Sequence, residues 1–267
     1  MNESYYPHKN SVFRQSMLKD MQDAQGHLFY DYFKGRGAYE IVERDDGYFD
    51  VGNPALYFAQ YGDWPEIEKK AMRHCSGRVL DIGCGAGRHA MYLQEQGFEV
   101  VGIDNSPLAV ETSRLRGLRD VRGLSIGEIS SALGVFDTVL MLGNNFGLFG
   151  SLNRGRRLLR KLDTITSADA RIIAETPDPH NTAVPEHLAY HKLNERRGRL
   201  PGQIRIRVRY RRYVTPWFDY LFVSKEEMLG MLKGTAWKVQ EFIEGEGPVY
   251  IAIMMKDKTK ESGDARV

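Results

Sequence analysis

Cysteine is nearly absent from this 267-residue chain, which contains only Cys75 and Cys84. Two thiols cannot form the disulfide framework that stabilises small secreted domains, and they cannot form a zinc site built from thiolates. Low cysteine usage also fits a reducing compartment, so we expect a cytoplasmic protein.

Long apolar runs and a charge excess are missing as well. No segment approaches the roughly 18 apolar residues that a membrane-spanning helix needs. The first residues, MNESYYPHKNSVFRQ, lack the apolar core of a secretory signal. We therefore expect no membrane association. The 37 Lys and Arg residues against 35 Asp and Glu residues give a formal net charge of only +2, so no overall field favours a nucleic-acid partner.

Short apolar runs alternate with helical patterns through the middle of the chain. Because strand, helix, strand units repeat, the pattern predicts a parallel sheet with helices on both faces. The final pair of strands is joined by a link too short for a crossover helix, so we expect an antiparallel hairpin there. The predicted strands are residues 78–82, 98–103, 120–122, 136–142, 170–176, 237–243 and 250–255.

These patterns predict an α/β fold: a Rossmann-like doubly wound sheet, mostly parallel, with a C-terminal antiparallel strand. Residues 1–60 exceed what the sheet requires and are interpreted as a helical N-terminal extension or cap. Residues 61–255 form the main domain, with an inserted β-hairpin lid at about 177–222, and residues 256–267 form a flexible tail. Both additions should fold over the carboxyl edge of the sheet, where open α/β sheets bind ligands.

The stretch VLDIGCGAGRHA, residues 79–90, places an acid and three glycines between an apolar run and a helix. Glycines allow a tight turn and close approach of a ligand, but an NAD fingerprint would need glycine where Arg88 stands, and the P-loop pattern is absent. Asp81 suits a ligand with an ammonium group, and Asp104 can accept hydrogen bonds from ribose hydroxyls. S-adenosylmethionine (SAM) combines a ribose and positive charge without phosphate. The alternative is that both acids only cap turns and the glycines only pack.

Three motifs, in order and at matching spacing, resemble those of the class I SAM-dependent methyltransferase family. VLDIGCGAGRH is similar to the first motif, VVGIDNSP to the second, and FDTVLMLGNNFG to the fourth-strand motif. The resemblance covers residues 63–176 and implies the family's fold, activity and SAM cofactor. It implies contacts with the methionine moiety for Asp81, Gly83, Cys84, Gly85 and Gly87, with the ribose for Asp104 and Asn105, with the adenine edge for Glu128 or Ile129, and beneath the sulfonium for Leu142, Gly143 and Asn144.

Methyl transfer from a sulfonium is an in-line displacement that needs alignment and exclusion of water, and a base only if the acceptor must lose a proton early. Asn145 is a candidate to orient the acceptor, although loop asparagines also simply form turns. The prolines that family members acting on nucleic-acid bases carry after the fourth strand are missing, which disfavours that activity. Cys84 is interpreted as a packing residue rather than a nucleophile.

Candidate residues also lie in the two additions to the sheet. Tyr57 and Tyr61 could close over the cofactor, because an aromatic face attracts a sulfonium; packing is the alternative. His187 and His191 share a face whether their segment is a helix or a strand, and they are the candidates for a general base. A metal site would need a third ligand that the sequence does not show, so we expect no metal and keep structural histidines as the alternative.

Residues 203–211, QIRIRVRYR, alternate strictly between apolar residues and arginines, which predicts a strand with one buried side. The arginine face could bind an acidic substrate or RNA, but we favour a solvated edge whose charges prevent aggregation. The leading hypothesis is a SAM-dependent methyltransferase acting on a small molecule. The alternatives are an RNA or protein methyltransferase that docks through Arg205–Arg212 and a SAM-binding module without catalysis. The acceptor atom and the oligomeric state are left open.

Overall fold

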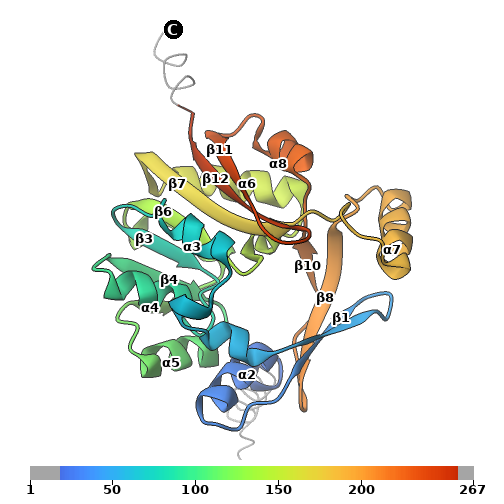
Figure 1. Ribbon diagram of the computed structural model, residues 1–267, viewed down its shortest axis with the longest axis horizontal. Coiled ribbons are helices and arrows are strands. Elements are labelled where there is room, and N and C mark those ends of the chain that lie inside the picture. The colour runs from blue at the N-terminus through green and yellow to red at the C-terminus, as the bar shows by residue number, and fades with distance from the viewer. Residues whose placement is uncertain (1–18, 258–267) are drawn as a thin grey trace, which may run out of the picture.

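Two sheets dominate the computed structural model, which describes residues 19–257 (Figure 1). The larger sheet has seven strands in the order β11-β12-β7-β6-β3-β4-β5. Strands β3 to β7 pair in parallel, and the C-terminal hairpin β11–β12 is antiparallel, as predicted. The strand bounds are β3 Val79–Ile82, β4 Val100–Asp104, β5 Val121–Gly123, β6 Phe136–Met141, β7 Thr166–Pro177, β11 Trp237–Glu244 and β12 Val249–Lys256.

Helices cover both faces of this sheet, because successive residues of a strand point to opposite sides. Val79 packs in the core beneath α3 and α4, whereas its neighbour Leu80 packs in the core beneath α6 and α8. This arrangement confirms the predicted doubly wound, Rossmann-like fold. The helix bounds are α3 Glu66–Met72, α4 Arg88–Glu95, α5 Pro107–Arg116, α6 Leu152–Asp163 and α8 Lys225–Leu232; short 3-10 helices are η1 Pro54–Phe58, η2 Tyr61–Asp63, η3 Ile126–Glu128, η4 Ser131–Leu133 and η5 Asn145–Phe149.

The smaller sheet joins the N-terminal extension to the insertion. Its antiparallel order is β10-β8-β1-β2, and the short strand β9 pairs with β8 as a hairpin. The extension contains a helix, as predicted, and also the hairpin β1–β2, which the sequence did not indicate. The insertion adds helix α7 to the predicted hairpin. The bounds are α2 Ala24–Phe33, β1 Glu40–Arg44, β2 Phe49–Gly52, α7 Pro185–Arg196, β8 Gln203–Tyr210, β9 Tyr213–Val214 and β10 Phe218–Leu221.

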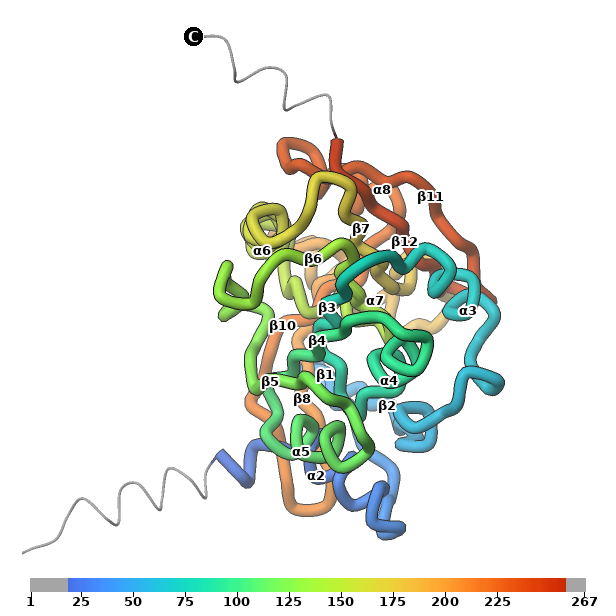
Figure 2. Tube along the Cα trace, turned by 90° about the vertical axis from the view of Figure 1, so that its left-hand side faces the viewer, coloured from blue at the N-terminus to red at the C-terminus, as the bar shows by residue number. Residues whose placement is uncertain are grey.

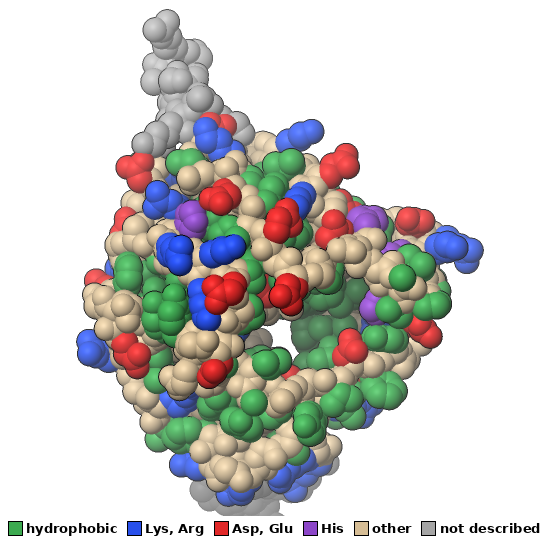
Figure 3. Space-filling view, viewed as in Figure 1, with side chains coloured by type: hydrophobic (Ala, Val, Ile, Leu, Met, Phe, Trp, Pro, Cys, Tyr) green, Lys and Arg blue, Asp and Glu red, His purple; other side chains and the backbone are tan. Residues whose placement is uncertain are grey.

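Helix α2 fixes the smaller sheet against the larger one. Figure 2 shows α2 and α5 together at one end of the molecule. Asp23 accepts a hydrogen bond from the N–H of Gly26 at the start of α2 (3.0 Å) and another from the N–H of Leu108 in α5 (3.2 Å). The smaller sheet therefore lies opposite the carboxyl ends of the parallel strands, and Figure 3 shows a hollow between the two bodies.

Two expectations concern parts of the chain that the structure covers incompletely. The predicted tail lies, from residue 258 on, outside the described residues, as do the first 18 residues of the predicted extension. Within residues 19–257, none of the helices combines the length and the apolar content needed to cross a bilayer.

Candidate functional site

The glycine-rich turn between β3 and α4 has a backbone that favours glycine. Gly83, Gly85 and Gly87 have φ angles of 71°, 54° and 83°, in the left-handed region that side chains disfavour. Gly87 is the N-cap of α4, so the first N–H groups of that helix face the turn. Cys84 is buried in the core beneath α3 and α4, and burial raises the pKa of its thiol far above the ordinary range. This environment fits packing rather than nucleophilic chemistry.

Asp81, at the end of β3, has an unsatisfied oxygen in the interior. Its side chain is 2% exposed, and Oδ2 has no hydrogen-bond partner among the described residues. Burial, followed by repulsion from Asp104, raises the pKa of this carboxyl to about 7. A buried acceptor without a donor destabilises the fold. An ammonium group would supply both the donor and the opposite charge, so Asp81 fits the amino group of SAM.

Asp104 ends the neighbouring strand β4 and shapes the same turn. Its Oδ2 accepts from the N–H of Gly85 at 3.0 Å, and its Oδ1 accepts from the N–H of Ser106 at 2.9 Å. Burial raises the pKa of this carboxyl to about 6. Because each carboxylate oxygen can accept a second hydrogen bond, lone pairs remain for two ribose hydroxyls. The following residue, Asn105, is exposed.

The loop after β6 approaches the turn from the other side. Leu142 is buried, and Gly143 and Asn144 have φ angles of 67° and 65°. The side-chain amide of Asn145 donates to two carbonyl groups at the end of β3, at 3.0 and 2.9 Å. This amide is already occupied, so the contacts favour a role in fixing the loop over a role in orienting an acceptor.

The two tyrosines of the extension lie in different places. The ring of Tyr57 contacts the edge of Phe29 at 4.8 Å between centroids, and the Phe29 ring lies 3.3 Å from where a Cβ on Gly85 would sit. Tyr57 therefore lies close to the glycine turn. Tyr61 instead stacks on Tyr92, in the second turn of α4, with centroids 4.3 Å apart.

The pair predicted for the adenine edge is used within the fold. Glu128 accepts from the N–H and Oγ of Ser125 at 2.8 and 2.7 Å, and these hydrogen bonds lower the pKa of its carboxyl. Ile129 is buried in the core beneath α6 and α8. The residue that the structure places beside Asp104 is Leu124, whose N–H donates to the Asp104 carbonyl at 2.9 Å.

The histidines predicted as candidate bases lie on α7. Nδ1 of His187 is 3.1 Å from the hydroxyl of Thr182, and the His191 ring lies 6.1 Å from the ring of His180. Histidine side chains gather over α7 beside the hollow in Figure 3. Burial lowers the pKa of His191, and the charged groups facing it belong to α7, β1 and the segment before α7, not to the glycine turn. Within residues 19–257, no three His, Cys, Asp or Glu side chains are placed to hold a metal ion.

A further buried carboxyl, which the sequence reasoning missed, lies near the end of β7. Glu175 is 6% exposed, and its Oε2 accepts from the N–H of Gly143 at 3.1 Å, so it faces the loop after β6. Burial, followed by repulsion from Glu68, raises the pKa of this carboxyl to about 7. Its position at the carboxyl edge of the sheet is the signal that could have identified it.

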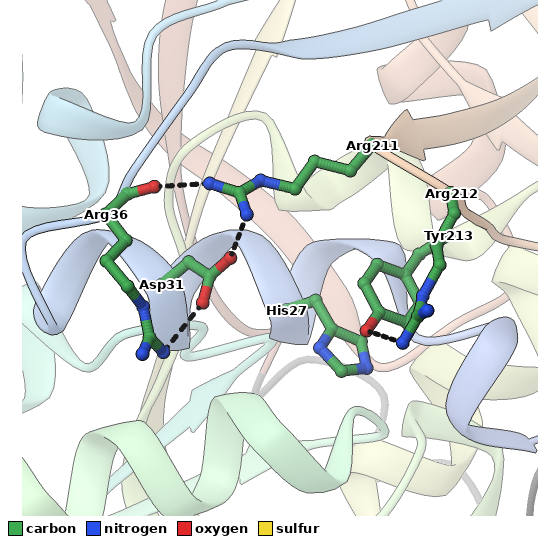
Figure 4. A pocket seen from close by; sticks show the side chains of 6 residues that line it. All are labelled: His27, Asp31, Arg36, Arg211, Arg212 and Tyr213. Carbon is green, nitrogen blue, oxygen red and sulfur yellow. Dashed lines mark hydrogen bonds and ion pairs between the residues drawn. The ribbon is translucent and has the colours of Figure 1, made fainter.

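A separate pocket of about 510 Å³ opens between α2 and the turn after β8 (Figure 4). Arg36 and Arg211 both pair with Asp31, at 3.0 and 3.4 Å, and the ring of His27 stacks on Tyr213 at 3.5 Å between centroids. These charges are satisfied within the chain, so we assign the pocket no ligand. Its lining residues are His27, Asp31, Arg36, Arg211, Arg212 and Tyr213.

Comparison with known proteins agrees with this geometry. A family model described as a methyltransferase domain matches residues 79–167, which run from β3 into β7. A SAM-dependent methyltransferase from Bacteroides fragilis, solved in complex with S-adenosyl-L-homocysteine (SAH), is 27% identical with a TM-score of 0.75. That match covers 88% of this chain and 95% of the other.

Two relatives with named acceptors match a smaller part. The 2-heptyl-1-hydroxyquinolin-4(1H)-one methyltransferase of Mycobacteroides abscessus is 29% identical over 44% of this chain and 47% of its own length. A human lysine N-methyltransferase that is named for ATP synthase is 33% identical over 45% of this chain and 50% of its own length. The chain thus spans about half the length of these relatives. The cofactor motifs, the strand order and these matches together show that the chain belongs to the class I SAM-dependent methyltransferases.

Proposed function

We propose that this chain transfers the methyl group of SAM to a small-molecule acceptor. SAM supplies an electrophilic methyl group on a positively charged sulfur, and the protein has to align a nucleophile with it and exclude water. Asp81 would bind the ammonium group and Asp104 the ribose, while the glycine turn would bind the methionine moiety. The observation that carries this proposal is the buried, donor-free oxygen of Asp81 beside a left-handed glycine turn.

The smaller sheet and α7 would form the lid of the acceptor site. The hollow between this lid and the carboxyl edge of the larger sheet is open in Figure 3. A hollow enclosed by two bodies favours a small acceptor, because a small ligand can be buried there and separated from water.

The arginines of β8 support the same choice, because they are neutralised within the chain. Arg207 pairs with Glu43 through two hydrogen bonds of 2.9 Å, and Arg209 pairs with the same carboxylate. The hydrogen bonds from these arginines lower the pKa of Glu43 to about 2, so the pairing persists at neutral pH. Paired arginines attract a phosphate backbone less than free ones do, which weighs against RNA as the acceptor.

A protein lysine is the second candidate acceptor, and one observation favours it. Phe49, Val51 and Leu56 are exposed apolar residues of β2 and η1, and exposed apolar patches commonly mark protein contacts. The human lysine N-methyltransferase has such an acceptor.

Incubation with SAM labelled at the methyl group separates these acceptors. Label should enter the small molecules of a metabolite extract and not total RNA or an extract of proteins. Label in RNA or protein alone would contradict the small-molecule assignment.

SAH binding tests the cofactor assignment separately. Asp104→Ala removes hydrogen bonds to the ribose, so SAH should bind about 100-fold to 1,000-fold more weakly, or about 3 to 4 kcal/mol. Isothermal calorimetry measures this, and circular dichroism checks that the fold persists. Asp120→Ala, an acid before β5 that is paired with Arg122, is the control and should bind SAH as the wild type does. Unchanged binding by Asp104→Ala would remove the ribose assignment.

A further inference from the structure

We propose that the methyl acceptor is an amine, which enters as its ammonium ion between Glu40 and Glu175 and gives a proton to Glu175 before methylation. This inference rests on the proposed function and adds the chemical class of the acceptor. It follows from two buried carboxyl groups on opposite walls of the hollow, neither of which is needed by the cofactor.

Glu40 provides a buried acceptor atom without a donor. The side chain is 1% exposed; Oε1 accepts from the Tyr57 hydroxyl at 2.7 Å, and Oε2 has no partner among the described residues. Side chains alternate along β1, so Glu40 shares the inner face with Val42, which lies opposite Val208 in the core beneath α2. Glu43 points to the outer face. An inward carboxylate with an empty oxygen calls for a ligand with N–H donors.

Aromatic residues connect Glu40 to Glu175 along the wall of the hollow. Tyr57, the partner of Glu40, lies within electrostatic reach of Tyr220 on β10. The hydroxyl of Tyr220 donates to the carbonyl of Asn144 at 2.7 Å, and Tyr220 in turn lies within electrostatic reach of Glu175. The two carboxyl groups therefore border one space, next to the loop that lies beneath the expected sulfonium.

The charges around this space favour a cationic acceptor. Arg88 faces both Asp81 and Glu175, but its guanidinium donates to Glu68 at 2.7 Å. Asp81 is assigned to the ammonium group of SAM, which leaves Glu40 and Glu175 without cations of their own. A carboxylate or phenolate acceptor would add negative charge beside two acids, whereas an ammonium ion would be attracted by both.

Glu175 is placed to take the proton that blocks the reaction. An ammonium nitrogen has no lone pair, so one N–H bond must break, with the proton passing to the Glu175 carboxylate. The nitrogen lone pair then forms a bond with the methyl carbon while the C–S bond breaks, and that electron pair stays on sulfur. The methylated ammonium ion leaves with SAH, and Glu175 returns its proton to solvent.

The environment of Glu175 suits this exchange near neutral pH. Burial, followed by repulsion from Glu68, raises the pKa of the carboxyl to about 7, within the range useful for a general base. The hydrogen bonds from the 143–144 loop oppose the rise. The groups that face Glu175 are Glu68 of α3, Arg88 of α4, Tyr220 of β10 and the N–H groups of Gly143 and Asn144.

The acceptor atom can be identified without knowing the acceptor. The full chain is incubated with SAM carrying a ¹³C methyl group and a small-molecule metabolite extract, and the ¹³C chemical shift of the transferred methyl is read by NMR. Methyl carbon bonded to nitrogen is expected; methyl bonded to oxygen, sulfur or carbon overturns the inference while leaving the proposed function intact. If SAH binds but no methyl is transferred, the proposed function fails.

Binding supplies a readout that does not depend on turnover. Small primary amines and their matched alcohols are titrated against the SAH complex. Amines should bind at least tenfold more tightly, and Glu40→Gln should remove most of that preference while SAH affinity stays within twofold. Glu43→Gln, on the outer face of the same strand, is the matched control and should keep the preference. Equal binding of amines and alcohols by the wild type overturns the inference.

Glu175→Gln tests the proton transfer. Glutamine keeps an oxygen for the N–H of Gly143 but cannot take a proton, so kcat for the amine should fall about 100-fold or more at pH 7. Raising the pH, which deprotonates the amine in solution, should restore part of the rate. A purely structural role would give a loss that pH does not relieve, and that outcome overturns the assignment of Glu175.

Discussion

At the scale of single residues, the site concentrates carboxyl groups whose ionisation is costly in the absence of ligand. Burial raises the pKa values of Asp81 and Glu175 to about 7 and that of Asp104 to about 6. Such a shift means that the folded, ligand-free chain holds protons that the unfolded chain would release. These groups therefore favour a cationic ligand at the expense of the stability of the empty protein, as is common for functional sites.

Asp81→Asn should separate these two effects. The folded pKa of about 7 exceeds the ordinary value of 3.8, so the contribution of Asp81 to stability is present below about pH 4 and is lost as the pH rises through 7. At pH 8 the ligand-free variant should be more stable than the wild type, by up to about 4 kcal/mol. It should also bind SAH about 100-fold more weakly. Urea unfolding at pH 5 and pH 8 measures the first effect and calorimetry the second; a variant that is less stable at pH 8 would contradict the account.

At the scale of elements, the turn between β3 and α4 works through its backbone. Gly85 has a φ of 54°, and a Cβ there would lie 3.3 Å from the Phe29 ring. Gly97, after α4, also has a positive φ, of 90°, but a Cβ there would meet nothing within 4 Å. The two positions share conformational strain and differ in what surrounds them.

Gly85→Ala and Gly97→Ala should therefore give different results. Each replaces a left-handed glycine, so each should lose about 1 to 2 kcal/mol of stability. Only Gly85→Ala should also weaken SAH binding, by at least tenfold, because its methyl group enters the turn and pushes against Phe29. Thermal unfolding and calorimetry measure the two quantities. Equal SAH affinity in both variants would mean that the turn does not contact the cofactor.

The sequence predicted those elements whose signal is local. The apolar runs of the larger sheet, the left-handed glycine turn and the alternating residues of β8 all depend on neighbours a few positions away. The hairpin β1–β2 was not predicted, because its pairing with β8 joins segments far apart in the chain. Glu40 was missed for the same reason: nothing near it in sequence shows that β1 turns this carboxylate inward.

The candidate site was predictable to a similar degree. Asp81, Asp104 and the glycines come from adjacent strand ends, and the structure brings them together. Tyr61 was assigned by its spacing before the first core helix, but its ring stacks on α4, since burial of its aromatic surface is decided by packing.

At the scale of the whole molecule, the two sheets enclose the cofactor site from opposite sides. The larger sheet contributes the glycine turn and the strand-end acids, and the extension contributes Phe29 and Tyr57. The body that contains β1 and β8 touches the larger sheet mainly through α2 and α5, through Phe29 at the turn and through Tyr220 at the 143–144 loop. A ligand between the two bodies should therefore stabilise both.

Hydrogen exchange monitored by mass spectrometry tests this coupling. With SAH at about 100 times its Kd, elements that must be closed for binding gain about 2.7 kcal/mol, which slows their amide exchange by about 100-fold. We expect this slowing at residues 83–87 and also at η1 and β1, because Tyr57 and Glu40 connect the extension to the site. Strand β11, at the far edge of the larger sheet, is the internal control for effects that are not local. Slowing confined to residues 79–104 would mean that the smaller sheet does not close over the cofactor, and the lid would then have to respond to the acceptor alone.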